Sequence, residues 1–129
     1  MASRIFVIED DALLRDAVDL ILEQAGYLVA TTGVGRGAPD LVTRFRPDLV
    51  LLDIQLPDIN GLAVLRSLRA TGLRAPVLMM TADGRPETVR DVMSSGGTGY
   101  LLKPFSPEAL VARVRLALNP GPRTEFTDV

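Results

Sequence analysis

The sequence of 129 residues contains no cysteine and no histidine. Disulfides and thiolate metal sites are therefore excluded, as are imidazole catalysis and the commonest zinc ligand. Any bound metal must be a hard cation held by oxygen atoms. Long apolar runs are also lacking near the start, where the run at residues 5–8 is too short for a signal peptide or a membrane span. We therefore expect a cytoplasmic protein without a membrane segment.

Lysine is the scarcest charged residue, because the fourteen basic residues comprise thirteen arginines and a single lysine, Lys103. Lysine carries a compact, strongly hydrated charge, whereas arginine carries a planar fork. The lone lysine therefore indicates a position that requires a compact ammonium. The overall charge of −2 gives no electrostatic reason to expect direct nucleic-acid binding. Apolar residues at 47% and charged residues at 23% are typical of one globular domain.

Four continuous apolar runs indicate strands that are buried on both faces of a parallel sheet. They are residues 5–8, 49–52, 77–80 and 100–102, and a weaker run at 28–31 predicts an edge strand. Helical periodicity occupies the intervals, at residues 14–25, 39–45, 62–68, 89–93 and 106–118. This alternation predicts a doubly wound α/β domain over residues 1–119. Residues 120–129 are interpreted as a flexible tail or the start of a linker.

Polar side chains stand at the carboxyl ends of four of these strands. They are Glu9, Asp10 and Asp11 after the first strand, Asp53 after the third, Thr81 after the fourth and Lys103 after the fifth. Functional groups of parallel sheets gather at this edge. Clustered carboxylates repel one another unless a cation intervenes, and oxygen ligands completed by water suit Mg²⁺. The pattern predicts a Mg²⁺ site beside which Lys103 would neutralise a phosphoryl group on an acidic oxygen.

Two of these acids also have a structural explanation. Asp11 fits the N-cap of the following helix, where acids are favoured. Glu9 and Asp10 fit that explanation poorly because they end the preceding strand. Asp53 could be an ordinary loop acid, but it directly follows four apolar strand residues and should therefore lie near the buried sheet.

Five motifs, in order and spacing, resemble the receiver domain of two-component response regulators over about residues 4–119. They are residues 7–11 (VIEDD), 47–53 (PDLVLLD), 56–61 (LPDING), 80–82 (MTA) and 99–105 (GYLLKPF). The resemblance implies a flavodoxin-like fold of the chemotaxis-regulator type. Such a fold has a five-stranded parallel sheet of order 2-1-3-4-5 flanked by five helices.

The resemblance also implies roles for the acidic residues. Asp53 would accept a phosphoryl group from a histidine kinase or a histidine phosphotransfer protein. The chain would then be a regulatory phosphoacceptor and not an enzyme. Mg²⁺, or Mn²⁺ in its place, would be bound directly by Asp10 and Asp53, through water by Glu9, and by the backbone carbonyl of Gln55.

Further roles follow from the same resemblance. Thr81 and Lys103 would bind phosphoryl oxygens, and the Lys103–Pro104 bond resembles the family's cis peptide, which would aim the ammonium into the site. Movement of Thr81 would let Tyr100 turn inward and remodel the face made by the fourth helix, fifth strand and fifth helix. That face would control a downstream protein or a covalently linked output domain, from a monomer or a phosphorylation-dependent dimer.

Some positions depart from the family pattern. Gln55 and Asp83 occupy positions that tune autodephosphorylation in the family, and we predict no phosphoryl lifetime from them. Gly99 and Ala109 stand where receivers linked to winged-helix DNA-binding domains often carry acids. These two residues argue against the dimer mode of those receivers.

Three other interpretations fit the sequence less well. A haloacid-dehalogenase-type phosphatase needs a second aspartate where Gln55 stands, and a cap insertion for which the chain is too short. A nucleotide- or flavin-binding module is suggested only by the glycines of residues 33–37, which lack a P-loop lysine and fit a flexible turn. A degenerate receiver is disfavoured because all five site positions are filled. The sequence is compatible both with a complete single-domain regulator and with a receiver domain from a longer protein.

Overall fold

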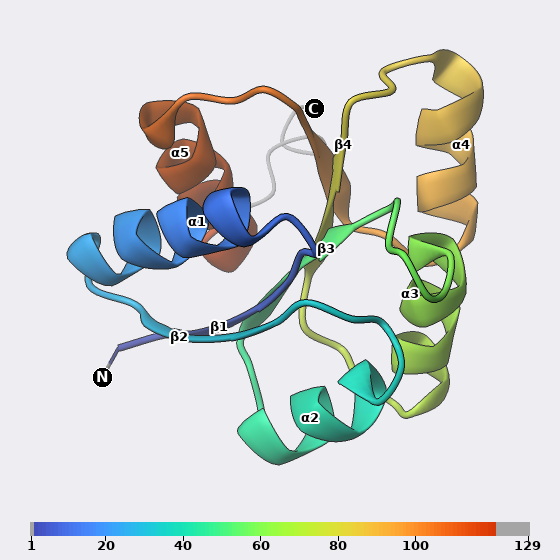
Figure 1. The fold of residues 1–129 in the computed structure, drawn as a ribbon, viewed down its shortest axis with the longest axis horizontal. Coiled ribbons are helices and arrows are strands. Elements are labelled where there is room, and N and C mark those ends of the chain that lie inside the picture. Colours follow the sequence, from blue (N-terminus) through green and yellow to red (C-terminus); the bar gives the residue numbers. More distant parts are fainter. Residues whose placement is uncertain (1, 121–129) are drawn as a thin grey trace, which may run out of the picture.

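The computed structural model describes residues 2–120, which form a parallel sheet between two layers of helices (Figure 1). The strands are β1 (Arg4–Ile8), β2 (Leu28–Thr32), β3 (Leu49–Asp53), β4 (Val77–Thr81) and β5 (Gly99–Leu102). The helices are α1 (Ala12–Gln24), α2 (Ala38–Phe45), α3 (Gly61–Ala70), α4 (Pro86–Ser94) and α5 (Pro107–Leu118). The strand order β2-β1-β3-β4-β5 confirms the predicted fold class. Except for residue 120, the predicted tail lies outside the described residues.

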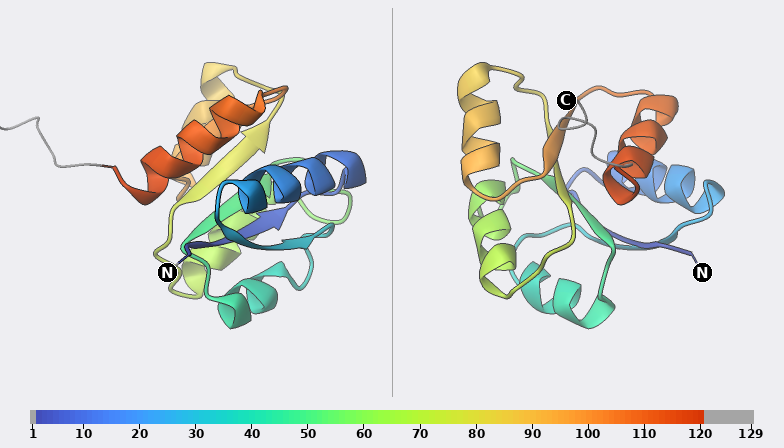
Figure 2. Two further views of the ribbon diagram at one scale, coloured as in Figure 1. Left: turned by 90° about the vertical axis from the view of Figure 1, so that its left-hand side faces the viewer. Right: turned by 180° about the vertical axis from the view of Figure 1, so that it is seen from behind.

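The strands β1, β3 and β4 are largely apolar and buried because both faces of the sheet are covered there. The edge strands β2 and β5 are partly exposed, so the prediction that residues 100–102 are buried on both faces was wrong for Leu102, which is 47% exposed. In β3, Leu49 and Leu51 belong to the core beneath α1 and α5, whereas Val50 and Leu52 belong to the core beneath α2, α3 and α4. Successive strand side chains point to opposite faces, so each strand contributes to both cores. Figure 2 shows α1 and α5 together on one side of the sheet and the other three helices on the other.

Local capping explains where several helices begin. The carboxylate of Asp11 accepts hydrogen bonds from the backbone N–H groups of Leu13 and Leu14. Asp11 is therefore the N-cap of α1, as the sequence predicted. Asn60 caps α3 and Ser106 caps α5 in the same way. Each cap follows a strand-end loop, and the caps therefore fix the path of the chain beside the sheet edge.

The glycine-rich segment at residues 33–37 forms the turn between β2 and α2, but this turn is held more firmly than predicted. The Asp58 carboxylate accepts the N–H groups of Gly35 at 3.0 Å and Arg36 at 2.8 Å. A side chain at Gly35 would collide with Ile59. The two backbone hydrogen bonds hold the pKa of Asp58 below its usual range. In residues 2–120, no helix has both the length and the apolar character needed to cross a membrane.

Candidate functional site

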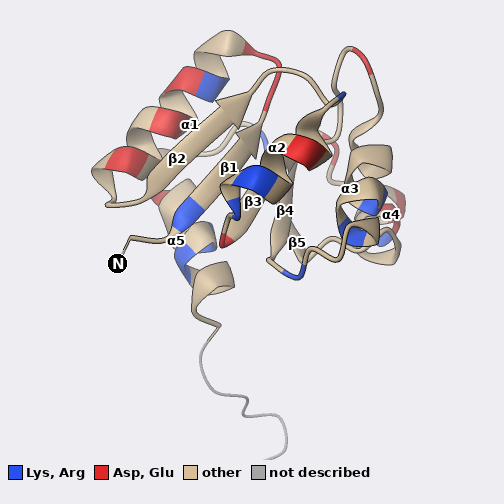
Figure 3. Ribbon diagram, turned by 90° about the horizontal axis from the view of Figure 1, so that it is seen from below, with Lys and Arg blue, Asp and Glu red and all other residues tan. Residues whose placement is uncertain are grey.

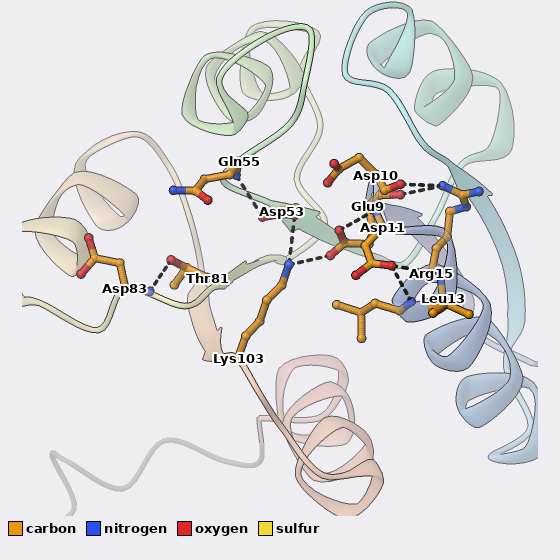
Figure 4. A network of polar contacts seen from close by, with 11 residues as sticks. Glu9, Asp10, Asp11, Leu13, Arg15, Asp53, Gln55, Thr81, Asp83 and Lys103 are labelled. Carbon is orange, nitrogen blue, oxygen red and sulfur yellow. Dashed lines mark hydrogen bonds and ion pairs between the residues drawn. The ribbon is translucent and has the colours of Figure 1, made fainter.

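The carboxyl ends of β1, β3, β4 and β5 meet at one edge of the sheet and bring the predicted polar residues together (Figure 4). Among the described residues, the buried polar side chains are Glu9, Asp53 and Thr81, exposed by 0%, 4% and 6% respectively. Buried polar groups are costly unless they are paired. Their concentration at one edge therefore marks this place as a site that the fold maintains.

Lys103 joins two of the strand ends. Its ammonium donates hydrogen bonds to Glu9 Oε1 at 2.8 Å and to Asp53 Oδ2 at 3.0 Å. The Lys103–Pro104 peptide bond is cis, as the family resemblance implied. A small charge with three donors can serve two separate carboxylates, which fits the use of lysine at this position.

The acidic residues form a group of oxygen donors that fits a hard cation. Glu9, Asp10 and Asp53 each offer a carboxylate oxygen, and these oxygens lie within 4.8 Å of one another. Glu9 and Asp53 are buried, whereas Asp10 is exposed at the mouth of the site. A set composed only of oxygen donors, open to water on one side, matches the preference of Mg²⁺.

Burial and ion pairing act in opposite directions on the charged groups. Burial raises the pKa of Glu9 from its ordinary 4.5 to about 7, although the hydrogen bond from Lys103 opposes the shift. Burial by itself would lower the pKa of Lys103, but the hydrogen bonds to Glu9 and Asp53 outweigh it and raise this pKa. The ammonium therefore stays charged, whereas burial moves the pKa of Glu9 toward neutrality.

Gln55 and Thr81 lie beside this cluster. The Gln55 N–H donates to Asp53 Oδ1 at 2.9 Å, so both oxygens of that carboxylate have a partner. The Thr81 hydroxyl accepts the N–H of Asp83 at 2.9 Å. This bond ties the end of β4 to the loop that leads into α4.

The Asp83 carboxylate is turned toward α4 and not toward the acidic cluster. Both of its oxygens are bound by the Arg85 guanidinium at 2.7–3.1 Å, and one also accepts from the Thr88 hydroxyl at 2.7 Å. These hydrogen bonds, with Arg85 the main contributor, hold the pKa of Asp83 far below its usual range. The side chain is thus engaged at the start of α4.

Tyr100 is the predicted residue that does not join the cluster. Its half-buried side chain packs against the core beneath α2, α3 and α4. Within residues 2–120, no hydrogen bond links its hydroxyl to Thr81. Its backbone carbonyl accepts from Arg113 at 3.0 Å, which fixes β5 against α5.

One residue at the site was not predicted. The Arg15 guanidinium donates to the backbone carbonyls of Glu9 at 3.0 Å and Asp10 at 3.4 Å (Figure 4). Helical side chains lean toward the helix N-terminus, so a residue one turn into α1 reaches back to the turn that precedes the helix. The position of Arg15 in the predicted helix was the signal that could have revealed it.

The fold and the site together define a class of protein. Acids, a hydroxyl and an ammonium stand beyond the strand ends of a doubly wound domain of order 2-1-3-4-5, where the strand order reverses and such domains bind their ligands. The family model described as the response regulator receiver domain matches residues 5–115. The chain therefore belongs to the response regulator receiver domain family.

Known relatives agree with this assignment. The DNA-binding response regulator MtrA of Mycobacterium tuberculosis is 44% identical over 121 residues, which cover 92% of this chain and 52% of the relative. Among solved structures, the chemotaxis protein CheY4 of Vibrio cholerae has a TM-score of 0.87 at 28% identity, covering 91% of this chain and 99% of that chain. The activated receiver domain of Klebsiella pneumoniae RstA has a TM-score of 0.84 at 31% identity, covering 90% and 98%.

The chain spans about half the length of the curated relatives that it matches. These relatives include a probable transcriptional regulatory protein of M. tuberculosis, TcrX, at 38% identity over 97% of this chain and 52% of that protein. The receiver family model covers most of the region of this chain that they match. The chain is therefore a signalling domain of the two-component type.

Proposed function

We propose that this chain is the phosphoryl-accepting switch of a two-component phosphorelay in the cytoplasm, with Asp53 as the phosphoacceptor. The donor would be a histidine kinase or a histidine phosphotransfer protein. The observation that carries the proposal is the pairing of one ammonium, Lys103, with the buried carboxylates of Glu9 and Asp53. An ammonium fixed beside a buried carboxylate can offset negative charge when a phosphoryl group is added to that carboxylate.

In the proposed transfer, an Asp53 oxygen bonds to phosphorus while the phosphorus–nitrogen bond of the donor phosphohistidine breaks. The electron pair stays on the imidazole nitrogen, which takes up a proton. Lys103, which is already held beside Asp53, would then neutralise charge on the phosphoryl oxygens. The chain modifies itself and turns over no separate substrate, so we class it as a regulatory phosphoacceptor and not as an enzyme.

Glu9, Asp10 and Asp53 fit a divalent cation, Mg²⁺ or Mn²⁺, because their carboxylate oxygens lie close together and the sequence contains neither cysteine nor histidine. We propose the backbone carbonyl of Gln55 as a further ligand and Glu9 as a ligand through water. When bound, the cation would supply positive charge between the carboxylates and the incoming phosphoryl group. The chain's own contribution is to hold the acids in place while Lys103 keeps its charge.

For switching, we propose that Thr81 binds a phosphoryl oxygen and that Tyr100 then turns inward. A hydroxyl can donate one hydrogen bond while it accepts another, so Thr81 can bind this oxygen without releasing the Asp83 N–H. The remodelled face of α4, β5 and α5 would control an output, which is a linked domain or a separate protein. MtrA is a DNA-binding regulator by name, but this chain corresponds to half of it. We propose no direct nucleic-acid contact by this domain, which would act as a monomer or as a phosphorylation-dependent dimer.

The proposal is tested with the Asp53→Asn variant. We expect acetyl phosphate with Mg²⁺ to label the unmodified chain and not this variant, because the amide lacks the nucleophilic carboxylate. We also expect Mg²⁺ to raise the melting temperature of the unmodified chain and to raise it less in the variant. Asp91→Asn, at an exposed position on α4, removes the same charge and should leave both results unchanged. Labelling that persists in Asp53→Asn would contradict the assignment of the phosphoacceptor.

A further inference from the structure

We infer that Arg15 is a positioning residue for the divalent-cation site, which it serves by holding the backbone of the Glu9–Asp10 turn. The inference rests on the proposed function, since it assumes that Glu9, Asp10 and Asp53 bind a cation. It assigns a favourable role to a positive charge that contacts two residues of the proposed cation site. Electrostatic repulsion alone would make Arg15 weaken cation binding. The sign of its effect on the Mg²⁺ dissociation constant therefore tests the inference.

The contacts of Arg15 are with carbonyl oxygens. Its Nη1 atom lies 3.0 Å from the Glu9 carbonyl and 3.4 Å from the Asp10 carbonyl. Arg15 is the basic residue of a helix whose remaining charges, Asp16, Asp19 and Glu23, are acidic, and Figure 3 shows one basic band among acidic bands along α1. Nevertheless, within the described part of the chain, Arg15 forms no ion pair. The guanidinium is used as a donor to the main chain.

The turn needs such a donor because Glu9 is completely buried. Its N–H donates to the Thr32 carbonyl at 3.1 Å, and its side chain accepts the N–H of Asp11 at 3.1 Å. These bonds hold the turn at the β2 side and at the start of α1. The carbonyls between them point to Arg15. A buried carbonyl that loses its donor is costly, so the turn would shift to find another partner.

Gly33 provides independent support. A Cβ atom built on Gly33 would lie 2.6 Å from Arg15 Nη1. The backbone at Gly33 does not require glycine, because the glycines with positive φ are at other positions. The missing side chain therefore leaves space for the guanidinium. This accounts for the first glycine of the segment at residues 33–37, which the proposed function does not explain.

Charge and position predict opposite effects on cation binding. If Arg15 acted mainly through its charge, removing that charge would tighten Mg²⁺ binding by reducing repulsion. If Arg15 positions the turn, removing it weakens binding because Asp10 and Glu9 are no longer held toward Asp53. Residues that orient metal ligands typically contribute about 10-fold to 100-fold to metal affinity. We therefore expect the geometric effect to exceed the repulsion from the half-buried Arg15 charge.

The experiment measures the Mg²⁺ dissociation constant by titration of MgCl₂ followed by backbone amide NMR, and the melting temperature in EDTA. We expect Arg15→Gln to weaken Mg²⁺ binding by about tenfold. Gly33→Ala should weaken it similarly, although the charge is kept, because the methyl group displaces the guanidinium. Arg15→Lys should fall between the unmodified chain and Arg15→Gln. Arg90→Gln, which removes an exposed charge from α4, should have no effect.

The double variant Arg15→Gln with Gly33→Ala decides whether the two residues act through one contact. We expect it to bind Mg²⁺ no more weakly than Arg15→Gln alone, because the second change has nothing left to displace. Tighter binding in Arg15→Gln, or unchanged binding in both single variants that remain folded in EDTA, would overturn the inference and leave the proposed function intact. Failure of the unmodified chain to bind Mg²⁺ would overturn the metal part of the proposed function and this inference with it.

Discussion

At the scale of the single residue, Glu9 links folding, cation binding and pH. Its carboxyl group is buried beside the Lys103 ammonium, and burial raises its pKa to about 7. The folded chain therefore holds this proton more tightly than the unfolded chain does. The resulting stabilisation is fully present below pH 4.5, the ordinary pKa of the group, and is lost as the pH rises toward 7. A cation that needs ionised Glu9 must displace the same proton.

We therefore expect Mg²⁺ binding to strengthen between pH 5.5 and 7.5, with an apparent dissociation constant that falls by at most about tenfold per pH unit. The metal-free melting temperature should lose the contribution of Glu9 over the same interval. Melting curves with EDTA and with MgCl₂ across this range measure both slopes. Glu9→Gln should flatten both, because the amide does not titrate. A pH dependence that is unchanged in Glu9→Gln would show that another group is responsible.

The sequence allowed site residues to be predicted where they directly follow a strand. Glu9, Asp53 and Lys103 were expected at one sheet edge, and the structure places them in hydrogen-bond contact. Arg15 was not predicted, because its partners are backbone carbonyls, and only its position one turn into the predicted helix pointed to this contact. The orientation of Asp83 toward Arg85 could not be predicted either, because the sequence offers Asp83 partners both at the site and at the start of α4.

At the scale of the element, α3 begins in direct contact with the end of β3. The N–H of Gly61 donates to the Ile54 carbonyl at 2.7 Å, and a Cβ atom at Gly61 would collide with the Asp53 carbonyl. Gly61 does not have a positive φ, so the space and not the conformation requires glycine there. The close approach fixes the loop that carries Asp53 and Gln55 against the helix.

Gly61→Ala should therefore destabilise the chain by about 2 kcal/mol or more, because the obstructing atoms belong to the backbone and cannot turn aside. It should also weaken Mg²⁺ binding, since the Asp53 carbonyl and side chain move together. Denaturant unfolding and the Mg²⁺ titration measure the two effects. Gly84→Ala is the matched control, because its methyl group would meet only Leu102 side-chain atoms at 3.3 and 3.6 Å. Equal stability of the two variants would contradict the packing argument.

The elements themselves were predictable, and their boundaries less so. The apolar runs located every strand, with the clearest signal at β1, β3 and β4, which are buried on both faces, and a weaker one at the partly exposed edge strand β2. Helix α4 was predicted at residues 89–93 but spans Pro86–Ser94. Its start has no side-chain cap hydrogen bond and few apolar residues, so periodicity detects only the apolar stretch around the buried Val92. The link from Asp58 to the β2–α2 turn joins residues 22 and 23 positions apart, and local patterns carry no information on such contacts.

At the scale of the whole molecule, one sheet separates two apolar cores. Leu22 of α1 lies in the core beneath α1 and α5, and Leu68 of α3 lies in the core on the opposite face. Both are completely buried. The strands belong to both cores, and their carboxyl ends carry the site. Loss of either core should therefore unfold the site together with the rest of the molecule.

We expect Leu22→Ala and Leu68→Ala each to lower the free energy of unfolding by about 3 kcal/mol, and the double variant to lower it by about their sum. Leu20→Ala, at a position on α1 that is 55% exposed, should have little effect. Stabilisation by saturating Mg²⁺ depends only on ligand concentration and affinity when the native site is intact, so its increment should be the same in all of these folded variants. Denaturant titrations with and without MgCl₂ measure both quantities. Two separate unfolding transitions, or a Mg²⁺ increment that falls with either leucine, would show that the two cores and the site are not one cooperative unit.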